Sequence, residues 1–305
     1  MVSTASRQAL GQLAHVVRSS STQQIRHATS LTSAIKISSV PAPHTGTIAV
    51  LSLNRGRARN ALSKSLLSEL SGVVDGLHAE DGKGSTRALI IASESDDAFC
   101  AGADLKERLE MSLNEVSEYL KRLRNTFSRL STLPIPTISA VSSTAFGGGL
   151  ELALSTNFRV FGSTATISLP ETRLGIIPGA GATYRLPALI GQSRAQDLIL
   201  TGRRVAAPEA YFLGLCDRLV EVTEEEFATP GVARGKVLEQ AMIMATDICD
   251  GAPVATRAAM QAIAGSRRGE AAESKAYEMV LHTQDRVEAL RAFVEKRDRP
   301  AFKGR

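Results

Sequence analysis

The chain has 305 residues, of which 43% are hydrophobic and 22% charged, a composition typical of a globular protein. No run of about 18 apolar residues occurs, which argues against a transmembrane helix. The three cysteines show no CxxC spacing and their odd number favours a reducing compartment, while the five histidines show no metal-ligand spacing, so no metal site is predicted.

The N-terminal 40 residues differ in composition from the rest of the chain. They contain no acidic residue and are rich in serine and threonine. Their basic residues are Arg7, Arg18, Arg26 and Lys36. This composition predicts a mitochondrial transit peptide over residues 1–30 and import into the matrix; a disordered basic tail is the alternative. Without these four charges the net charge falls from +5 to +1, which gives no indication of nucleic-acid binding.

Strand and helix patterns alternate through the first two thirds of the chain. Helical spacing of apolar residues predicts helices over 62–77 and 112–130. Short apolar runs predict buried strands over 48–53, 87–92, 135–141, 158–161 and 166–169. This alternation predicts an α/β domain with parallel pairing, which we assign to residues 40–230.

From about residue 208 the chain is predicted to be mostly helical. The predicted helices cover 233–250, 253–265 and 269–296, and the last is long enough to be two helices. We assign residues 231–305 to a helical C-terminal region. Because such a tail has no core of its own to cover, we expect it to pack on a neighbouring subunit.

Three consecutive glycines, Gly147, Gly148 and Gly149, stand at the predicted start of a helix. Glycine has no Cβ, so the backbone can approach a ligand closely, and the first N–H groups of a helix lack helical partners. An anionic oxygen placed there would gain those donors. A tight packing turn is the alternative, and a dinucleotide site is disfavoured because GxGxxG is not matched.

Two glutamates, 20 residues apart, follow these glycines. Glu151 lies among apolar neighbours, which predicts burial and a raised pKa suited to proton transfer, whereas the alternative is a solvent-facing or capping side chain. Glu171 precedes a glycine-rich apolar stretch, 174–181, that is typical of a pocket wall. With residues 99–106, these segments can supply two N–H donors and two acid/base groups around one thioester carbonyl.

Residues 101–106, 147–151 and 170–181 resemble, in order and spacing, the crotonase (enoyl-CoA hydratase/isomerase) superfamily. The resemblance extends from about residue 48 to residue 297. It implies a spiral of repeated ββα turns with a helical C-terminal trimerisation region, assembled as a homotrimer or a dimer of trimers. It implies an acyl-CoA thioester substrate and no cofactor, since coenzyme A is part of the substrate.

The resemblance also implies roles for individual residues. The N–H groups of Ala103 and Gly148 match the oxyanion hole, and Glu151 and Glu171 match the two catalytic glutamates of hydratases. The residues that match coenzyme A and substrate contacts are Arg57, Ala58, Arg59, Ala101, Asp104, Leu105, Lys106, Gly179 and, from a neighbouring subunit, Tyr277 and Lys296.

Within the family, residues 104–108 and 171–178 are most similar to the mitochondrial methylglutaconyl-CoA hydratases of leucine breakdown, a branch that includes an AU-rich RNA-binding homologue. The resemblance therefore implies addition of water to a branched 2-enoyl-CoA. Arg108 is our candidate contact for the distal carboxylate of such a substrate, and a surface charge is the alternative. An isomerase, a broad short-chain hydratase and an RNA-binding protein with vestigial activity are the alternative functions.

Some positions depart from the family pattern. Ala182 and Tyr184 stand where glycine and glutamine are usual, and Asn157 stands where aspartate is usual. None of these changes removes a catalytic group, but they bear on the shape of the pocket. The segment that is a lysine-rich helix in the RNA-binding homologue has only Arg59 and Lys64 as basic residues here, so RNA binding is not expected.

Overall fold

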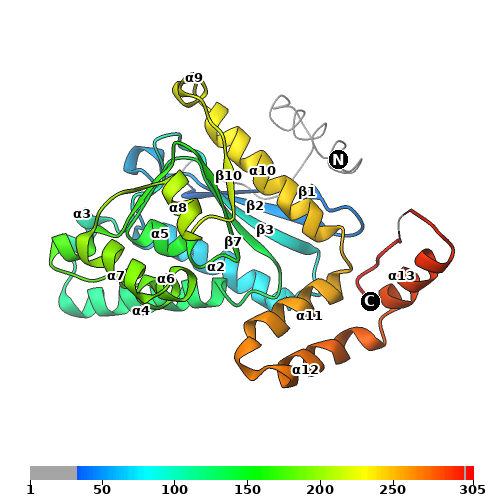
Figure 1. Ribbon diagram of the computed structural model, residues 1–305. Helices are drawn as coiled ribbons and strands as arrows, with labels where there is room; N and C mark the ends of the chain where they lie inside the picture. Colours follow the sequence, from blue (N-terminus) through cyan, green and yellow to red (C-terminus); the bar gives the residue numbers. More distant parts are fainter. Residues whose placement is uncertain (1–32, 299) are drawn as a thin grey trace.

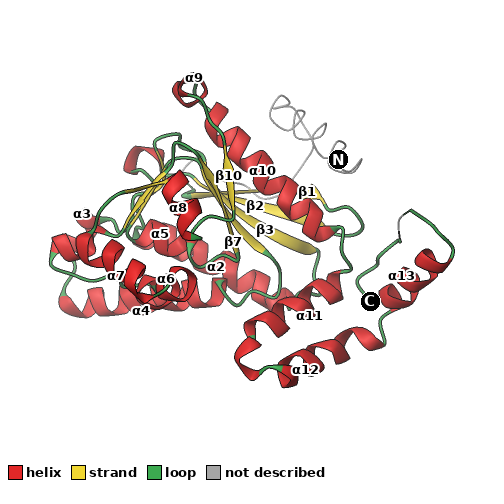
Figure 2. Ribbon diagram, viewed as in Figure 1, coloured by secondary structure: helices red, strands yellow, loops and turns green. Residues whose placement is uncertain are grey.

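The computed structural model describes residues 33–298 and 300–305. The predicted transit peptide, residues 1–30, lies outside the described residues. Two β-sheets form the centre of the molecule, and helices pack around them (Figure 1, Figure 2). In the described ranges no helix is long and apolar enough to cross a membrane.

The larger sheet has six strands, and all neighbours run parallel except the first pair. Its strands, in spatial order, are β1 (Ile35–Pro41), β2 (Thr47–Leu53), β3 (Thr86–Ser93), β5 (Thr137–Val141), β7 (Phe158–Gly162) and β10 (Arg218–Val220). The predicted strands 48–53, 87–92, 135–141 and 158–161 correspond to β2, β3, β5 and β7, and the predicted α/β class with parallel pairing is confirmed.

Strand β1 was not predicted, although it pairs along its whole length with β2. It is an edge strand on which only Ile35 is buried, and Ile37 is 58% exposed. Because one side of an edge strand has no neighbour and much of this one faces solvent, its sequence lacks the apolar run that marks the buried strands. The ordered sheet therefore begins at residue 35, ahead of the predicted boundary at residue 40.

The larger sheet is covered on both faces, which explains why its strands are almost continuously apolar. On one face, Leu51 and Ile91 belong to the same buried cluster as Leu66 of α2 (Lys64–Glu80). On the other face, Ile90 belongs to a second cluster with Val237 of α10 (Val232–Cys249). Alternate residues of β3 thus enter two separate cores.

The smaller sheet contains β4 (Ala98–Cys100), β6 (Thr144–Phe146), β8 (Thr166–Ser168) and β9 (Val205–Ala206). Its first three strands run parallel, and β9 joins β8 antiparallel. Each of the pairs β3–β4, β5–β6 and β7–β8 places its first strand in the larger sheet and its second in the smaller one, and helical segments follow. The spiral of ββα turns implied by the resemblance is confirmed.

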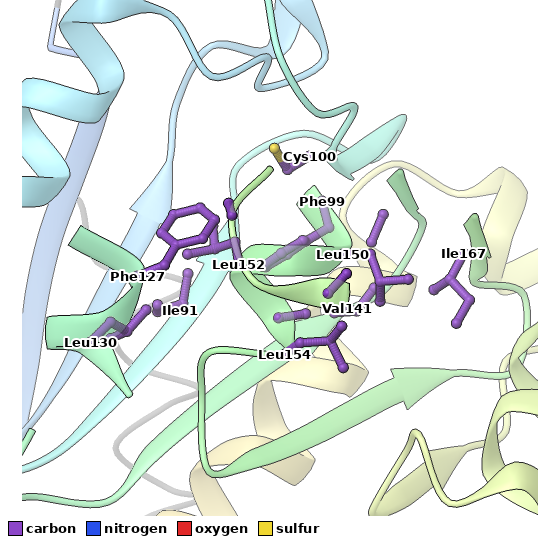
Figure 3. Close-up of a cluster of buried hydrophobic side chains, with 14 of the residues drawn as sticks. Ile91, Phe99, Cys100, Phe127, Leu130, Val141, Leu150, Leu152, Leu154 and Ile167 are labelled. Carbon is purple, nitrogen blue, oxygen red and sulfur yellow. The ribbon is translucent and has the colours of Figure 1, made fainter. Parts of the chain in front are cut away.

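Helices follow the strands of the spiral. They are α3 (Leu105–Glu110), α4 (Leu113–Leu130), α5 (Gly148–Ala153), α6 (Ala182–Ile190), α7 (Gln192–Thr201), α8 (Ala207–Leu213) and α9 (Glu224–Ala228), with short 3-10 helices η1 (Gly56–Ala58) and η2 (Pro170–Leu174). Helix α4 begins with a capping box, in which Ser112 accepts from the Glu115 N–H and Glu115 accepts from the Ser112 N–H. Figure 3 shows Leu150 and Leu152 of α5 among buried apolar side chains, so this short helix is held by the core.

The helical C-terminal region, residues 231–305, begins with α10, which packs on the larger sheet. It continues with α11 (Pro253–Ala264), η3 (Ser266–Arg268), α12 (Glu270–Leu281) and α13 (Gln284–Val294). The predicted helix 269–296 is thus two helices, because Thr283 caps α13 by accepting from the Arg286 N–H. Helices α12 and α13 lie away from the sheets in Figure 1. Their exposed apolar side chains include Tyr277, Leu290, Phe293 and Val294.

Candidate active site

Three parallel strands of the smaller sheet deliver the three predicted site segments to one edge. Strand β4 leads into residues 101–103, β6 into Gly147 and α5, and β8 into η2, which contains Glu171. Because parallel strands end at the same edge of a sheet, segments far apart in the sequence meet there. The spiral path of the chain therefore brings the three segments together at this edge.

Two glycines let the backbones of these segments touch. A Cβ on Gly102, which has φ +95°, would lie 2.7 Å from the Phe146 carbonyl oxygen and 3.3 Å from the Gly148 nitrogen. A Cβ on Gly149 would collide with the Cys100 carbonyl oxygen. The close approach brings the Ala103 nitrogen within 3.8 Å of where a Gly148 Cβ would be. Within residues 33–298 and 300–305 neither the Ala103 nor the Gly148 N–H donates a hydrogen bond, so both can serve a ligand oxygen.

Glu151 lies in the first turn of α5 and is only 2% exposed. Its Oε1 accepts hydrogen bonds from the Ala180 N–H (2.7 Å) and the Ala182 N–H (3.0 Å). Burial raises the pKa of Glu151, while these two N–H groups and the positive charge of Arg185 act in the opposite direction. Both of these hydrogen bonds end on Oε1, so Oε2 can accept a proton from a bound water.

Glu171 faces the same space from η2 and is also buried. Its Oε2 has no hydrogen-bond partner in the described part of the chain. Its Oε1 lies close to the Gly147 backbone, 2.9 Å from where a Cβ would be. Burial raises the pKa of Glu171 to about 7, and the nearby negative charge of Glu151 adds to this shift. A carboxyl group with this pKa can hold a proton near neutral pH and donate it.

A cavity of about 450 Å³ joins these groups. Its lining includes Ala103, Gly148, Glu151 and Glu171. The rest of the wall is mostly apolar, with residues such as Leu120 and Ile177 from α4 and the glycine-rich loop. Two backbone donors and two carboxylates thus face one apolar cavity of a size that suits a small acyl group.

The other predicted contact residues divide into two groups. Those that line the cavity are Ala101, Leu105, Arg108 and Gly179. Those that lie outside its lining are Arg57, Ala58, Arg59, Asp104, Lys106, Tyr277 and Lys296. Arg59 borders a neighbouring hollow of about 290 Å³ that shares Ala101 with the cavity. The substrate and coenzyme A contacts of both groups stay predictions.

The carboxylate of Asp104 serves the fold. It caps α3 by accepting from the Glu107 N–H, and it pairs with Arg55 at 3.2 Å. It therefore holds the loop before α2 against the segment that carries Ala103. Tyr277 is 59% exposed on α12, and Lys296 follows α13, so within one subunit both lie outside the cavity.

Two arginines near the cavity were not predicted. Arg124 of α4 lines the cavity and donates from Nε to the Gly179 carbonyl oxygen at 2.8 Å. Arg185 of α6 donates to the Ala180 carbonyl oxygen at 2.8 Å. An arginine that binds a backbone carbonyl leaves no residue-type pattern in the sequence, and on a helix it cannot be told from a surface charge.

The departures from the family pattern have local explanations. Asn157 Oδ1 accepts from the Thr137 N–H at 2.8 Å and from the Thr137 hydroxyl at 2.9 Å, so an amide oxygen performs the task that a carboxylate oxygen could. Ala182 is buried and its N–H binds Glu151. Tyr184 is 57% exposed, and its ring lies 5.0 Å from the Arg185 guanidinium.

Comparison with known proteins agrees with this geometry. The family model described as enoyl-CoA hydratase/isomerase matches residues 44–305. An enoyl-CoA isomerase/hydratase of Zymoseptoria tritici is 68% identical over 276 residues, which cover 90% of each chain. A mitochondrial methylglutaconyl-CoA hydratase of Pyricularia oryzae is 49% identical, covering 89% of this chain and 87% of the relative. The crystal structure of an enoyl-CoA hydratase from Bacillus anthracis matches with a TM-score of 0.78 and 40% identity, covering 88% of this chain and 99% of that one.

Proposed function

The chain belongs to the enoyl-CoA hydratase/isomerase family, and we propose that within this family it adds water to a branched 2-enoyl-CoA, with 3-methylglutaconyl-CoA as the preferred substrate. The enzyme class, an enoyl-CoA hydro-lyase, follows from the relatives. The observation that carries the proposal is the pair of buried carboxylates, Glu151 and Glu171, facing one cavity beside two backbone N–H groups that have no acceptor among the described residues.

The proposed reaction uses these groups in one addition. The N–H groups of Ala103 and Gly148 bind the thioester oxygen and stabilise the enolate; one such donor is typically worth about 10²–10³ in rate. Glu151 Oε2 takes a proton from water as the water oxygen bonds to Cβ. Glu171 delivers its proton to Cα, and the carbonyl re-forms. Only side chains, backbone and substrate take part, so the proposal needs no cofactor beyond the coenzyme A of the substrate.

Burial raises the pKa of both glutamates, and their hydrogen bonds distinguish the two. Glu151 is held at one oxygen by two N–H groups, which act against the effect of burial and favour the ionised form required of a base. Glu171 has a buried oxygen without a hydrogen-bond partner in the described ranges, and burial raises its pKa to about 7, which favours the protonated form required of an acid. An isomerase moves one proton within the substrate and needs a single acid/base group. Two carboxylates in different environments therefore favour hydration.

Arg108 supports the choice of a substrate with a distal carboxylate. It lies on α3 in the cavity wall, 5.7 Å from the Tyr119 ring, and has no carboxylate partner within the described ranges. A substrate carboxylate entering an apolar cavity loses its water, so a cation must meet it. The similarity to a methylglutaconyl-CoA hydratase over most of the chain points to the same substrate class.

Steady-state kinetics on a panel of 2-enoyl-CoA esters test the substrate. We expect the highest kcat/KM with 3-methylglutaconyl-CoA, whereas a uniform profile across short chains would identify a broad short-chain hydratase. Arg108→Met should raise KM for methylglutaconyl-CoA about 10- to 100-fold, because a hydrogen bond to a charged group contributes about 1.5–3 kcal/mol. Crotonyl-CoA has no distal carboxylate and is the control; equal effects on both substrates would contradict the role of Arg108.

We also propose where the protein is located and how it assembles. Mitochondrial relatives and the acid-poor N-terminal segment support a matrix location. The exposed apolar faces of α12 and α13 support a homotrimer or a dimer of trimers. An RNA-binding role finds no support, because Lys64, the sole lysine of α2, is paired with Glu115 at 3.0 Å.

A further inference from the structure

The guanidinium of Arg185 contacts the loop before α6, whose N–H groups bind Glu151. Its Nη1 donates to the Ala180 carbonyl oxygen at 2.8 Å. Its Nη2 donates to the Phe127 carbonyl oxygen at 3.2 Å and to the Ser131 hydroxyl at 3.4 Å, both at the end of α4. One side chain therefore ties the loop to a helix that is anchored in the core.

The same loop holds Glu151 through its N–H groups. Ala180 donates its N–H to Glu151 Oε1 and gives its carbonyl oxygen to Arg185, so adjacent peptide groups face the two side chains. Ala182 supplies the second N–H. A shift of the Ala180 carbonyl would move the donors that orient Glu151. The position of the carboxylate thus depends on Arg185 through a single stretch of backbone.

Gly181 shows how tightly the guanidinium packs against this loop. It has φ +122°, and a Cβ there would collide with Arg185 Nη1 and lie 2.8 Å from the Tyr184 hydroxyl. Only glycine leaves room for the arginine to reach the Ala180 carbonyl oxygen. The contact is therefore built into the backbone of the loop.

Charge adds to this geometry. Burial raises the pKa of Glu151, and the positive charge of Arg185 makes that rise smaller. In the described part of the chain, the other charged or titratable groups around this pair are Glu171 of η2, Tyr184 of α6 and Arg124 of α4. Glu171 is the group that we propose to be protonated, and Arg124 binds the Gly179 carbonyl oxygen on the cavity side.

We propose that Arg185 is a positioning residue for the hydration step. It fixes the loop so that the Ala180 and Ala182 N–H groups hold one oxygen of Glu151 and leave the other free for the attacking water. Its charge also favours the ionised Glu151 that takes the proton from water. This inference rests on the proposed function, because it assigns Glu151 the part of the base.

Kinetics of Arg185 variants separate positioning from a role in stability alone. In Arg185→Met, kcat should fall about 10- to 100-fold, because a displacement of about 1 Å at a catalytic group can cost about 10²-fold. KM should change less than about threefold, since Arg185 does not line the cavity, and the acid limb of the kcat–pH profile should move to higher pH. Arg185→Lys should keep the acid limb near its wild-type position but recover kcat only in part, because lysine lacks the planar fork.

Two controls complete the kinetic test. Arg122→Met removes an exposed arginine of α4 whose contact is the Ser68 hydroxyl, and it should leave kcat and its pH profile unchanged. Millimolar guanidinium, far below denaturing concentrations, should raise the kcat of Arg185→Ala and leave wild type unaffected. A folded Arg185→Met protein with wild-type kcat and an unmoved acid limb would overturn the proposal. A loss of kcat would also overturn it if the acid limb did not move and guanidinium did not restore the kcat of Arg185→Ala.

An infrared titration tests the same inference without relying on turnover. The difference between spectra of wild type and Glu151→Gln isolates the Glu151 carboxyl band, and its midpoint should rise in the Arg185→Met background. An unchanged midpoint overturns the inference even if hydration is observed. A raised midpoint in a protein that fails to hydrate any enoyl-CoA would instead support the positioning role and contradict the proposed function.

Discussion

Replacing Glu171 by glutamine should change stability in a way that depends on pH. The folded carboxyl keeps its proton up to about pH 7, whereas its ordinary value is 4.5. The unfolded state therefore releases this proton first, and the stability of the wild-type protein falls as pH rises from about 4.5 to about 7. Glutamine does not titrate, so the stability of the variant does not fall in this way over the same pH range.

The size of the effect follows from the two pKa values. The interval from 4.5 to about 7 corresponds, at about 1.4 kcal/mol for each pKa unit, to about 3 kcal/mol. The glutamine amide also needs hydrogen-bond partners at a site where Oε2 has none, a cost of about 1–3 kcal/mol that does not vary with pH. The change in unfolding free energy on substitution should therefore be about 3 kcal/mol more favourable at pH 8 than at pH 4.5.

Urea unfolding at several pH values measures this difference. Wild type and Glu171→Gln are compared at equal protomer concentration, because assembly makes apparent stability depend on concentration. As pH rises, we expect the urea midpoint of wild type to fall toward that of Glu171→Gln or below it. A difference between the two proteins that stays constant from pH 4.5 to pH 8 would refute the raised pKa of Glu171 and, with it, its assignment as the acid.

Two further predictions follow from packing and from the C-terminal helices. Gly149→Ala should destabilise the protein by about 3 kcal/mol or more in thermal unfolding, because its Cβ would collide with the Cys100 carbonyl oxygen. Gly72→Ala in α2 is the control: a Cβ there would have no described atom within 4 Å, so this variant should be more stable than wild type by up to about 1 kcal/mol. Similar losses of stability in both variants would contradict the close approach of Gly149 to Cys100. Deleting residues 269–305 should dissociate the oligomer and abolish activity together, and sedimentation that finds fully active monomeric wild type would refute the assembly.

The predictability of the fold depends on burial. Strands β2, β3, β5 and β7 could be predicted because both faces of their sheet are covered, which leaves continuous apolar runs. Strand β1 could not, because it lies at an edge. The division of 269–296 into two helices depends on the Thr283 cap, which a periodicity pattern does not reveal.

The residues of the candidate site also differ in how well the sequence predicts them. Glu151 stood out because it lies among apolar neighbours, and Glu171 because a glycine-rich apolar stretch follows it; the resemblance to the family matched both, and the structure brings both to one cavity. Asp104 has an equally conspicuous setting in the sequence, yet its carboxylate pairs with Arg55. Arg185 binds a backbone carbonyl oxygen, which any residue provides, so no sequence pattern indicates the role that we propose for it.

The central claim is that two carboxylates with opposite protonation states carry out hydration, and kcat of Glu151→Gln and Glu171→Gln with 3-methylglutaconyl-CoA tests it most directly. Each variant should lose at least about 10² in kcat, within the range of general acid–base groups, and should bind coenzyme A esters as wild type does and remain assembled. Near wild-type hydration by either variant would contradict the role assigned to that glutamate and the mechanism built on the pair.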